Sequence, residues 1–274
     1  RVNKELIIRS NSSAVDFALL KDGKLIELNR EVDNNKFSVG DIYAAKIRKP
    51  ISGLNAAFVS VGHEKDGFLH YHDLGPNLST LLKYFKQVSS GRIKDYSLKN
   101  FRFEKEIPKD GSIQDYLQPQ QQILVQIVKE PISTKGPRVS SELSLAGRFM
   151  VLIPFSDRIS ISQKIESNTE KNRLKKLVKS IRPKGFGIII RTVAKDQKVK
   201  ELDSDLQQLL GRWKNLCEKF VKVDQYPNKI LSEINRSSSI LRDIFDNDFT
   251  GIHVDDPEMR QEIMDYLKTI APNK

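Results

Sequence analysis

Cysteine is nearly absent from this sequence, since Cys217 is the only one in 274 residues. A lone cysteine excludes an internal disulfide and any zinc site made of paired cysteines from this chain. No stretch approaches the roughly 20 apolar residues of a membrane-spanning helix, and no apolar leader opens the chain. We therefore expect a soluble, cytoplasmic protein. Because the chain opens at Arg1 rather than Met, we also expect it to be a piece of a longer protein.

Motifs of nucleotide hydrolysis and of nucleophilic catalysis are missing as well. The sequence has no Gly-x-x-x-x-Gly-Lys-Ser/Thr phosphate loop, and no Cys-His motif that would make Cys217 a nucleophile. Its acidic residues are scattered among lysines, and the one close group, Asp243, Asp246 and Asp248, has no metal-binding motif around it. We expect no catalytic residue and no bound metal in this chain.

Positive charge, by contrast, is in excess. Lysine and arginine number 46 against 35 aspartates and glutamates, which gives a net charge of +11. A surface with this charge attracts polyanions, so nucleic acid is the leading candidate partner. The excess also fits a protein whose charge only keeps it soluble.

Patterns of apolar residues predict a mixed α+β fold with several modules. Alternating runs predict strands at 5–10, 14–20 and 25–28, the last two joined by an Asp-Gly turn at 22–23. Short runs split by Gly and Pro between 39 and 130 predict a small barrel. Helices are expected at 169–181 and 199–221. Two amphipathic helices with a short strand at 251–254 between them are expected at the end.

Residues 75–121 interrupt the predicted barrel. They are rich in Lys, Ser, Gln and Tyr and show little apolar periodicity, so we interpret them as an insertion loop, more typical of a flexible decoration than of a site. The alternative is phosphate contact through its basic residues, which are Lys83, Lys86, Arg92, Lys94, Lys99 and Arg102.

The segment 55–62 is the most informative, because its residues can be compared with the two-residue period of a strand. Ala57, Val59 and Val61 share one face, which leaves Phe58 on the other. A second ring, Phe68, follows in the sequence Gly-Phe-Leu. Two rings on the outer face of a basic barrel form a platform for stacking nucleic-acid bases. The alternative is that both rings fill a gap against a neighbouring module.

The block 42–74, with its Ala-Ala-Phe-Val-x-x-Gly and Gly-Phe-Leu motifs, resembles the S1 domain of the ribonuclease E/G family. The resemblance implies that Phe58 and Phe68 stack on RNA bases and that Lys135, in a Lys-Gly element, contacts the RNA backbone. It continues through the sequence Ser-Leu-Ala-Gly-Arg-Phe-Met-Val-Leu-Ile-Pro at 144–154, which is similar to the segment after the S1 domain in that family. It spans most of the chain, and the insertion at 75–121 departs from it.

A second candidate site lies where an apolar run ends in Arg191 and Thr192. A guanidinium and a hydroxyl at one strand end can both donate to a single phosphate. An arginine in this place can equally pair with a surface carboxylate. The resemblance to the ribonucleases implies a sensor of 5′-monophosphates, in which Arg191 and Thr192 bind the phosphate. Backbone amides near Gly147 and Val151 would help to close that pocket.

The same resemblance implies how the chain and its parent protein are organised. It places a ribonuclease-H-like subdomain at 1–37 and 225–274, split by an inserted S1 (OB-type) barrel at 38–135 and a mixed 5′-sensor region at 136–224. The parent is expected to be a Mg²⁺-dependent homo-oligomeric endoribonuclease that cuts single-stranded RNA, preferably 5′-monophosphorylated, in rRNA processing or mRNA decay. Residues for Mg²⁺, and for Zn²⁺ at an oligomer interface, would lie outside this chain. The alternative is a catalytically silent S1-type RNA-binding protein.

Overall fold

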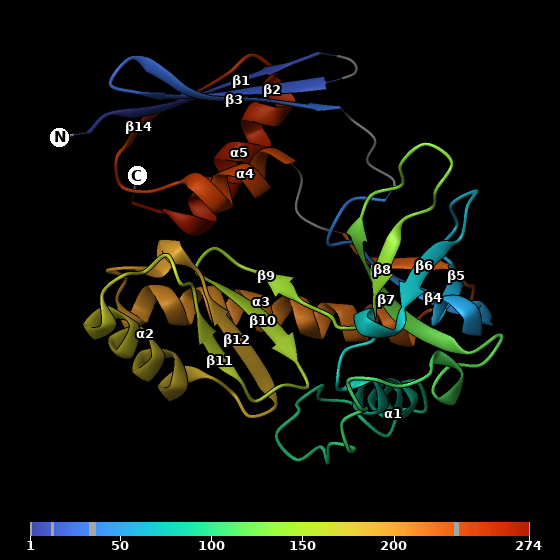
Figure 1. The fold of residues 1–274 in the computed structure, drawn as a ribbon. Coiled ribbons are helices and arrows are strands. Elements are labelled where there is room, and N and C mark those ends of the chain that lie inside the picture. Colours follow the sequence, from blue (N-terminus) through green and yellow to red (C-terminus); the bar gives the residue numbers. More distant parts are fainter. Residues whose placement is uncertain (1, 12–13, 33–36, 233–235, 274) are drawn as a thin grey trace. The chain divides into compact units, whose positions relative to one another are not determined.

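The computed structural model describes residues 2–11, 14–32, 37–232 and 236–273. They belong to two compact units, one made of 1–36 with 234–274 and the other of 37–233. Figure 1 shows the course of the chain through both, with blue strands and red helices in the first unit. The mixed α+β character predicted from the sequence is confirmed.

The smaller unit joins the first strands of the chain to the last one. β1 (Lys4–Ser10), β2 (Ala14–Lys21) and β3 (Lys24–Val32) form an antiparallel meander, and β14 (Phe249–Val254) pairs with β1 in parallel. The turn predicted between β2 and β3 is confirmed, because Asp22 and Gly23 have positive φ angles of 50° and 76°. Two positive φ angles are what a tight two-residue hairpin requires.

Two helices bury the apolar face of this sheet. They are α4 (Arg236–Ile244) and α5 (Pro257–Ile270). The side chain of Asp256 accepts hydrogen bonds from the amides of Glu258 and Met259, and so fixes the start of α5. The core shared by sheet and helices consists of Leu6, Ile8, Phe17, Leu241, Phe245, Phe249 and Ile263.

A closed five-stranded barrel forms the first part of the larger unit. Its strands are β4 (Ile42–Ile51), β5 (Ala56–Ser60), β6 (Gly67–His70), β7 (Gln122–Lys129) and β8 (Arg138–Ser140). They follow the order β4-β5-β6-β8-β7, and β7 pairs back onto β4. This is an OB-type arrangement, so the small barrel predicted from short strands split by Gly and Pro is confirmed.

The barrel sheet takes in one more strand from far along the chain. β13 (Asn228–Leu231) pairs antiparallel with the start of β4. The domain boundary predicted at 224/225 assigned β13 to the second part of the ribonuclease-H-like subdomain. The pairing of β13 with β4 places it in the barrel sheet instead. In the part of the chain that the structure describes, short 3-10 helices lie at η1 (Ser52–Leu54), η2 (Tyr71–Asp73), η3 (Ile113–Asp115) and η4 (Thr192–Ala194).

The second part of the larger unit is a four-stranded sheet with two helices packed on it. Its strands follow the order β11 (Ile159–Ile161), β12 (Phe186–Ile190), β10 (Met150–Pro154) and β9 (Leu145–Ala146). α2 (Asn168–Ile181) packs on β11 and β12, and α3 (Val199–Val221) on β9 and β10. The predicted apolar stripe of α3 is buried, and Cys217 lies within it.

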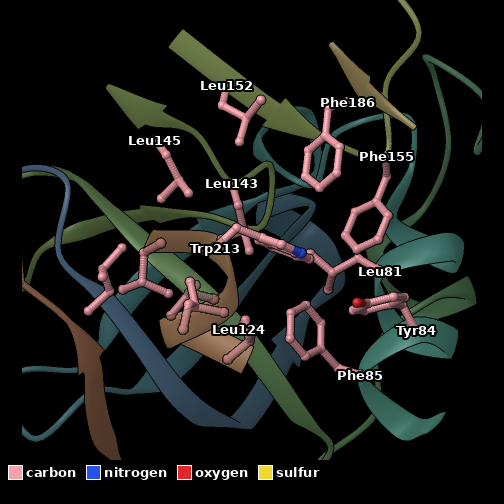
Figure 2. Packing of buried hydrophobic residues seen from close by; sticks show 14 of the residues in the cluster. Leu81, Tyr84, Phe85, Leu124, Leu143, Leu145, Leu152, Phe155, Phe186 and Trp213 are labelled. Carbon is pink, nitrogen blue, oxygen red and sulfur yellow. The ribbon is translucent and has the colours of Figure 1, made fainter. Parts of the chain in front are cut away.

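The interpretation of residues 75–121 as a flexible loop is wrong. α1 (Leu78–Ser89) begins this segment and buries Leu78, Leu81, Phe85 and Val88 at helical spacing. Figure 2 shows Tyr84 and Phe85 of α1 near Trp213 of α3. The ring centroid of each lies 5.8 Å from that of Trp213. The segment is therefore part of the main core and ties the barrel to α3. Lys83, one of its basic residues, is held by Glu104 at 2.6 Å.

Candidate functional site

Phe58 and Phe68 lie side by side on the outer face of the barrel. They are directly opposite each other in the β5–β6 ladder, and their ring centroids are 6.0 Å apart at an interplanar angle of 65°. Both side chains are half-buried, whereas Ala57 and Val59 are fully buried on the inner face of β5. The prediction from strand parity, that Phe58 points outward, is confirmed, and Phe68 lies beside it.

The two rings and Lys135 line a single groove with a volume of about 690 Å³. Of its other charged residues, Lys65, Lys129 and Arg138 are basic and Asp66 and Glu130 acidic, so with Lys135 there are four cations against two anions. Lys135 is exposed. Two rings and an excess of cations in one groove match the chemistry of an unpaired nucleic-acid strand, which offers flat bases and phosphates.

Gly136 allows Lys135 to reach this groove. A Cβ atom at position 136 would lie 2.1 Å from the carbonyl oxygen of Asp66 and 2.8 Å from that of Lys65. The preceding turn is closed by a hydrogen bond of 2.9 Å from the Lys135 amide to the Ile132 carbonyl. The backbone at 132–136 therefore packs directly on 65–66, and a side chain at position 136 would push it away.

We expect Gly136→Ala to weaken RNA binding through displacement of Lys135. Contact with a backbone carbonyl cannot be relieved by a rotamer change, so the unfolding free energy should also fall, by about 1–3 kcal/mol. Thermal unfolding and oligonucleotide binding measure the two effects. Gly53→Ala is the matched control, since nothing lies within 4 Å of a Cβ atom there. Unchanged binding in Gly136→Ala would contradict the role given to this glycine.

The second candidate site is a corner where β12 ends against the turn between β9 and β10. The Nη1 atom of Arg191 donates to the Gly147 carbonyl at 2.8 Å, and the Arg191 amide donates to the Phe149 carbonyl at 2.8 Å. The Gly147 amide donates to the Met150 carbonyl. Val151 lies in the adjoining strand, opposite Ile189. The structure thus brings Arg191, Gly147 and Val151 into one corner, while their part in phosphate binding stays a prediction.

Two residues of this corner, Ser162 and Asp205, were not predicted from the sequence. The hydroxyl oxygens of Ser162 and Thr192 are 2.7 Å apart, so the hydroxyl of the residue after Arg191 is paired with a second hydroxyl. The carboxylate of Asp205 lies inside the β9–β10 turn and accepts hydrogen bonds from its amides. A signal for Asp205 was present, because an acidic residue interrupts the apolar stripe that includes Leu202 and Leu206.

Ion pairing holds the loop that follows Thr192. Glu170 accepts hydrogen bonds from Arg173 at 2.6 Å and from the Asp196 amide at 2.9 Å, and Arg173 also donates to the Gln197 carbonyl. The hydrogen bond from Arg173 lowers the pKa of Glu170 to about 2, so this carboxylate is charged at neutral pH. The start of α2 therefore anchors the loop that follows Thr192.

The His, Cys, Asp and Glu side chains within the described ranges do not form a metal site. No three His, Cys, Asp or Glu side chains there are grouped in a way that could hold an ion. Of the acidic group near 245, Asp246 pairs with Lys4, and Asp243 pairs with Arg242 at 3.2 Å. Cys217 is fully buried, which raises the pKa of its thiol. Among the described residues, every helix is too short or too polar to cross a bilayer.

The fold and the groove define an α+β protein built around an OB-type barrel, and comparison with known proteins narrows this class. Residues 144–274 match the model of the Ribonuclease E/G family. Ribonuclease G of Escherichia coli (strain K12) is 28% identical over 268 residues, which are 98% of this chain and 51% of that protein. Ribonuclease G of Haemophilus influenzae is 30% identical over 98% of this chain and 50% of its own length. Ribonuclease E of Nostoc sp. is 29% identical over 97% of this chain and 34% of its own length.

Over nearly its whole length the chain is therefore similar to proteins named ribonuclease G and ribonuclease E, and residues 144–274 match the family model. The chain spans about half the length of the ribonuclease G relatives that it matches, and about a third of the ribonuclease E relative.

Proposed function

We propose that this chain is the RNA-binding and 5′-monophosphate-sensing part of an endoribonuclease that cuts single-stranded RNA. The observation that carries the proposal is the groove in which Phe58, Phe68 and Lys135 meet. Stacking on an aromatic ring is worth roughly 1–3 kcal/mol per base and is tolerant of sequence, because every base has a π-face. The net charge of +11 adds a phosphate-directed attraction that weakens as salt is raised.

The corner at Arg191 supports the second half of the proposal. Its guanidinium is a fixed fork with one arm on the Gly147 carbonyl, and the hydroxyl of the next residue, Thr192, is paired with that of Ser162. A terminal monophosphate offers charge and acceptor oxygens to such donors. A 5′-hydroxyl offers neither charge nor a phosphoryl group, and a triphosphate is too large for a fixed fork. The corner would therefore read the state of the RNA end.

Hydrolysis belongs, in this proposal, to a part of the parent protein outside this chain. A carboxylate-held Mg²⁺ would polarise the phosphate and activate water. The acidic group near 245 is a poor donor set for it, because Lys4 and Arg242 already pair with two of its members. We assign the unit of 1–36 and 234–274 to a ribonuclease-H-like subdomain without metal chemistry. We propose that the parent protein is a cytoplasmic homo-oligomer with Zn²⁺ at its interface and that it acts in rRNA processing or mRNA decay.

We expect the 274-residue chain to bind RNA without cutting it, and a version extended through the following domain to cut single-stranded substrate. The assay is incubation of each protein with end-labelled 5′-monophosphorylated RNA, with and without Mg²⁺. Asp246→Asn tests the acidic group near 245, and Asp265→Asn, an exposed position on α5, is its matched control. Cutting by the short chain that EDTA and Asp246→Asn abolish would place the hydrolytic site in the smaller unit and overturn this assignment.

The names of the relatives favour an enzyme over a catalytically silent binding protein. An extended protein that binds RNA and cuts none would reverse that preference.

A further inference from the structure

We propose that Asp205 is the positioning residue of the Arg191 corner: its carboxylate fixes the β9–β10 turn, and this turn orients the guanidinium of Arg191. The inference rests on the proposed sensing of 5′-monophosphates and names a residue on which that sensing depends.

The carboxylate of Asp205 is enclosed by backbone amides of the turn. Its Oδ1 accepts a hydrogen bond of 3.0 Å from the Arg148 amide, and its Oδ2 accepts bonds of 2.9 Å from Phe149 and 3.2 Å from Met150. The residue is only 8% exposed. Burial raises the pKa of Asp205, and the three amide donors act in the opposite direction. A buried carboxylate is costly unless it is bonded in this way, so α3 and the turn hold each other in register.

Gly147 closes the turn onto the carboxylate from the other side. A Cβ atom at position 147 would lie 2.7 Å from both carboxylate oxygens of Asp205. With that contact fixed, the Gly147 carbonyl accepts from Nη1 of Arg191 and the Phe149 carbonyl accepts from the Arg191 amide, each at 2.8 Å. An unbroken series of hydrogen bonds therefore links Asp205 to both the backbone and the side chain of Arg191.

The same contacts remove the turn amides from the groups that can bind an RNA end. Three successive amides facing one point would be an anion site if they were open to solvent. Here the protein's own carboxylate occupies them, so an RNA phosphate meets the guanidinium of Arg191 and the hydroxyls of Thr192 and Ser162 instead. Asp205 thereby directs recognition to groups at the surface of the corner.

The test compares one oligonucleotide with a 5′-monophosphate, with a 5′-hydroxyl and in circular form. In Asp205→Asn a side-chain NH₂ group replaces an acceptor oxygen and opposes the amide donors of the turn. We expect the preference for the monophosphate to fall to within about twofold of unity, since it depends on charge-assisted bonds from a well-aimed fork. Affinity for circular RNA should stay that of the parent. Asp203→Asn is the matched control, two residues away on the same helix and bonded to Gln207 of that helix.

The outcomes separate this inference from the proposed function. If the parent protein shows no preference for the monophosphate, 5′ sensing itself fails. If the parent shows it and Asp205→Asn keeps it, the positioning role is overturned. If Asp205→Asn does not fold, Gly147→Ala decides, because it presses on the same carboxylate from the turn and should remove the same preference. Hydrogen exchange of the amides at 148–150 checks the cause: it should rise in the variant while the rest of the chain stays protected.

Discussion

Replacing Phe58 and Phe68 together by alanine should remove most of the affinity for unstructured RNA and leave the protein folded. Each ring that stacks on a base contributes roughly 1–3 kcal/mol, so the double variant should lose about 2–6 kcal/mol, at least about thirtyfold in affinity. The rings are half-buried and line the groove, so their removal exposes no large part of the barrel interior. Fluorescence anisotropy with a 5′-hydroxyl oligonucleotide at fixed salt measures the change without contribution from the Arg191 corner.

Phe103→Ala is the matched control for the double variant. Phe103 is also half-buried, but its ring packs against Phe101 and Phe155, with centroids 6.4 and 6.2 Å away, and not in the groove. We expect this control to lose stability and keep its RNA affinity. A double variant that binds as tightly as the parent would refute the stacking platform. A loss of folding stability as large as the loss of affinity would favour the alternative that the rings only fill space.

The platform could be predicted from the sequence, but the groove could not. A strand alternates its faces with a period of two, so the outward direction of Phe58 is local information. The meeting of Lys135 with both rings depends on the close backbone contact of Gly136 with 65–66, which a closed barrel creates between segments far apart in the chain. Only the resemblance to a family linked Lys135 to the rings beforehand.

The misinterpretation of 75–121 and the missed role of Asp205 also arise from contacts between segments far apart in the sequence. In the segment 75–121 the apolar spacing of Leu78, Leu81 and Phe85 did indicate a helix, but the average composition of the segment concealed it. The partner of that helix, Trp213, lies on another helix much later in the chain. Asp205 likewise stood out within an apolar stripe, while the amides that satisfy it belong to a turn that no helical pattern predicts.

Arg191→Ala should erase the preference for a 5′-monophosphate over a 5′-hydroxyl. Charge-assisted hydrogen bonds contribute roughly 1.5–3 kcal/mol, so the parent should prefer the monophosphate by about tenfold to 150-fold. Arg191→Lys keeps the charge but loses the planar fork that spans the Gly147 carbonyl and the ligand, so it should recover only a small part of the preference. Competition between the two forms of one labelled oligonucleotide gives the ratio directly.

Circular RNA and a distant lysine separate end recognition from general charge. Circular RNA has no 5′ end, so Arg191→Ala should lower its affinity no more than the removal of one positive charge elsewhere on the protein does. Lys176→Ala removes one exposed charge from α2 and should lower binding of all three RNAs slightly and equally. If Arg191→Ala keeps the monophosphate preference, the sensor lies elsewhere. If it weakens circular RNA as much as monophosphorylated RNA, Arg191 is a backbone contact, because only a group that meets the terminal phosphate can distinguish a strand with an end from one without.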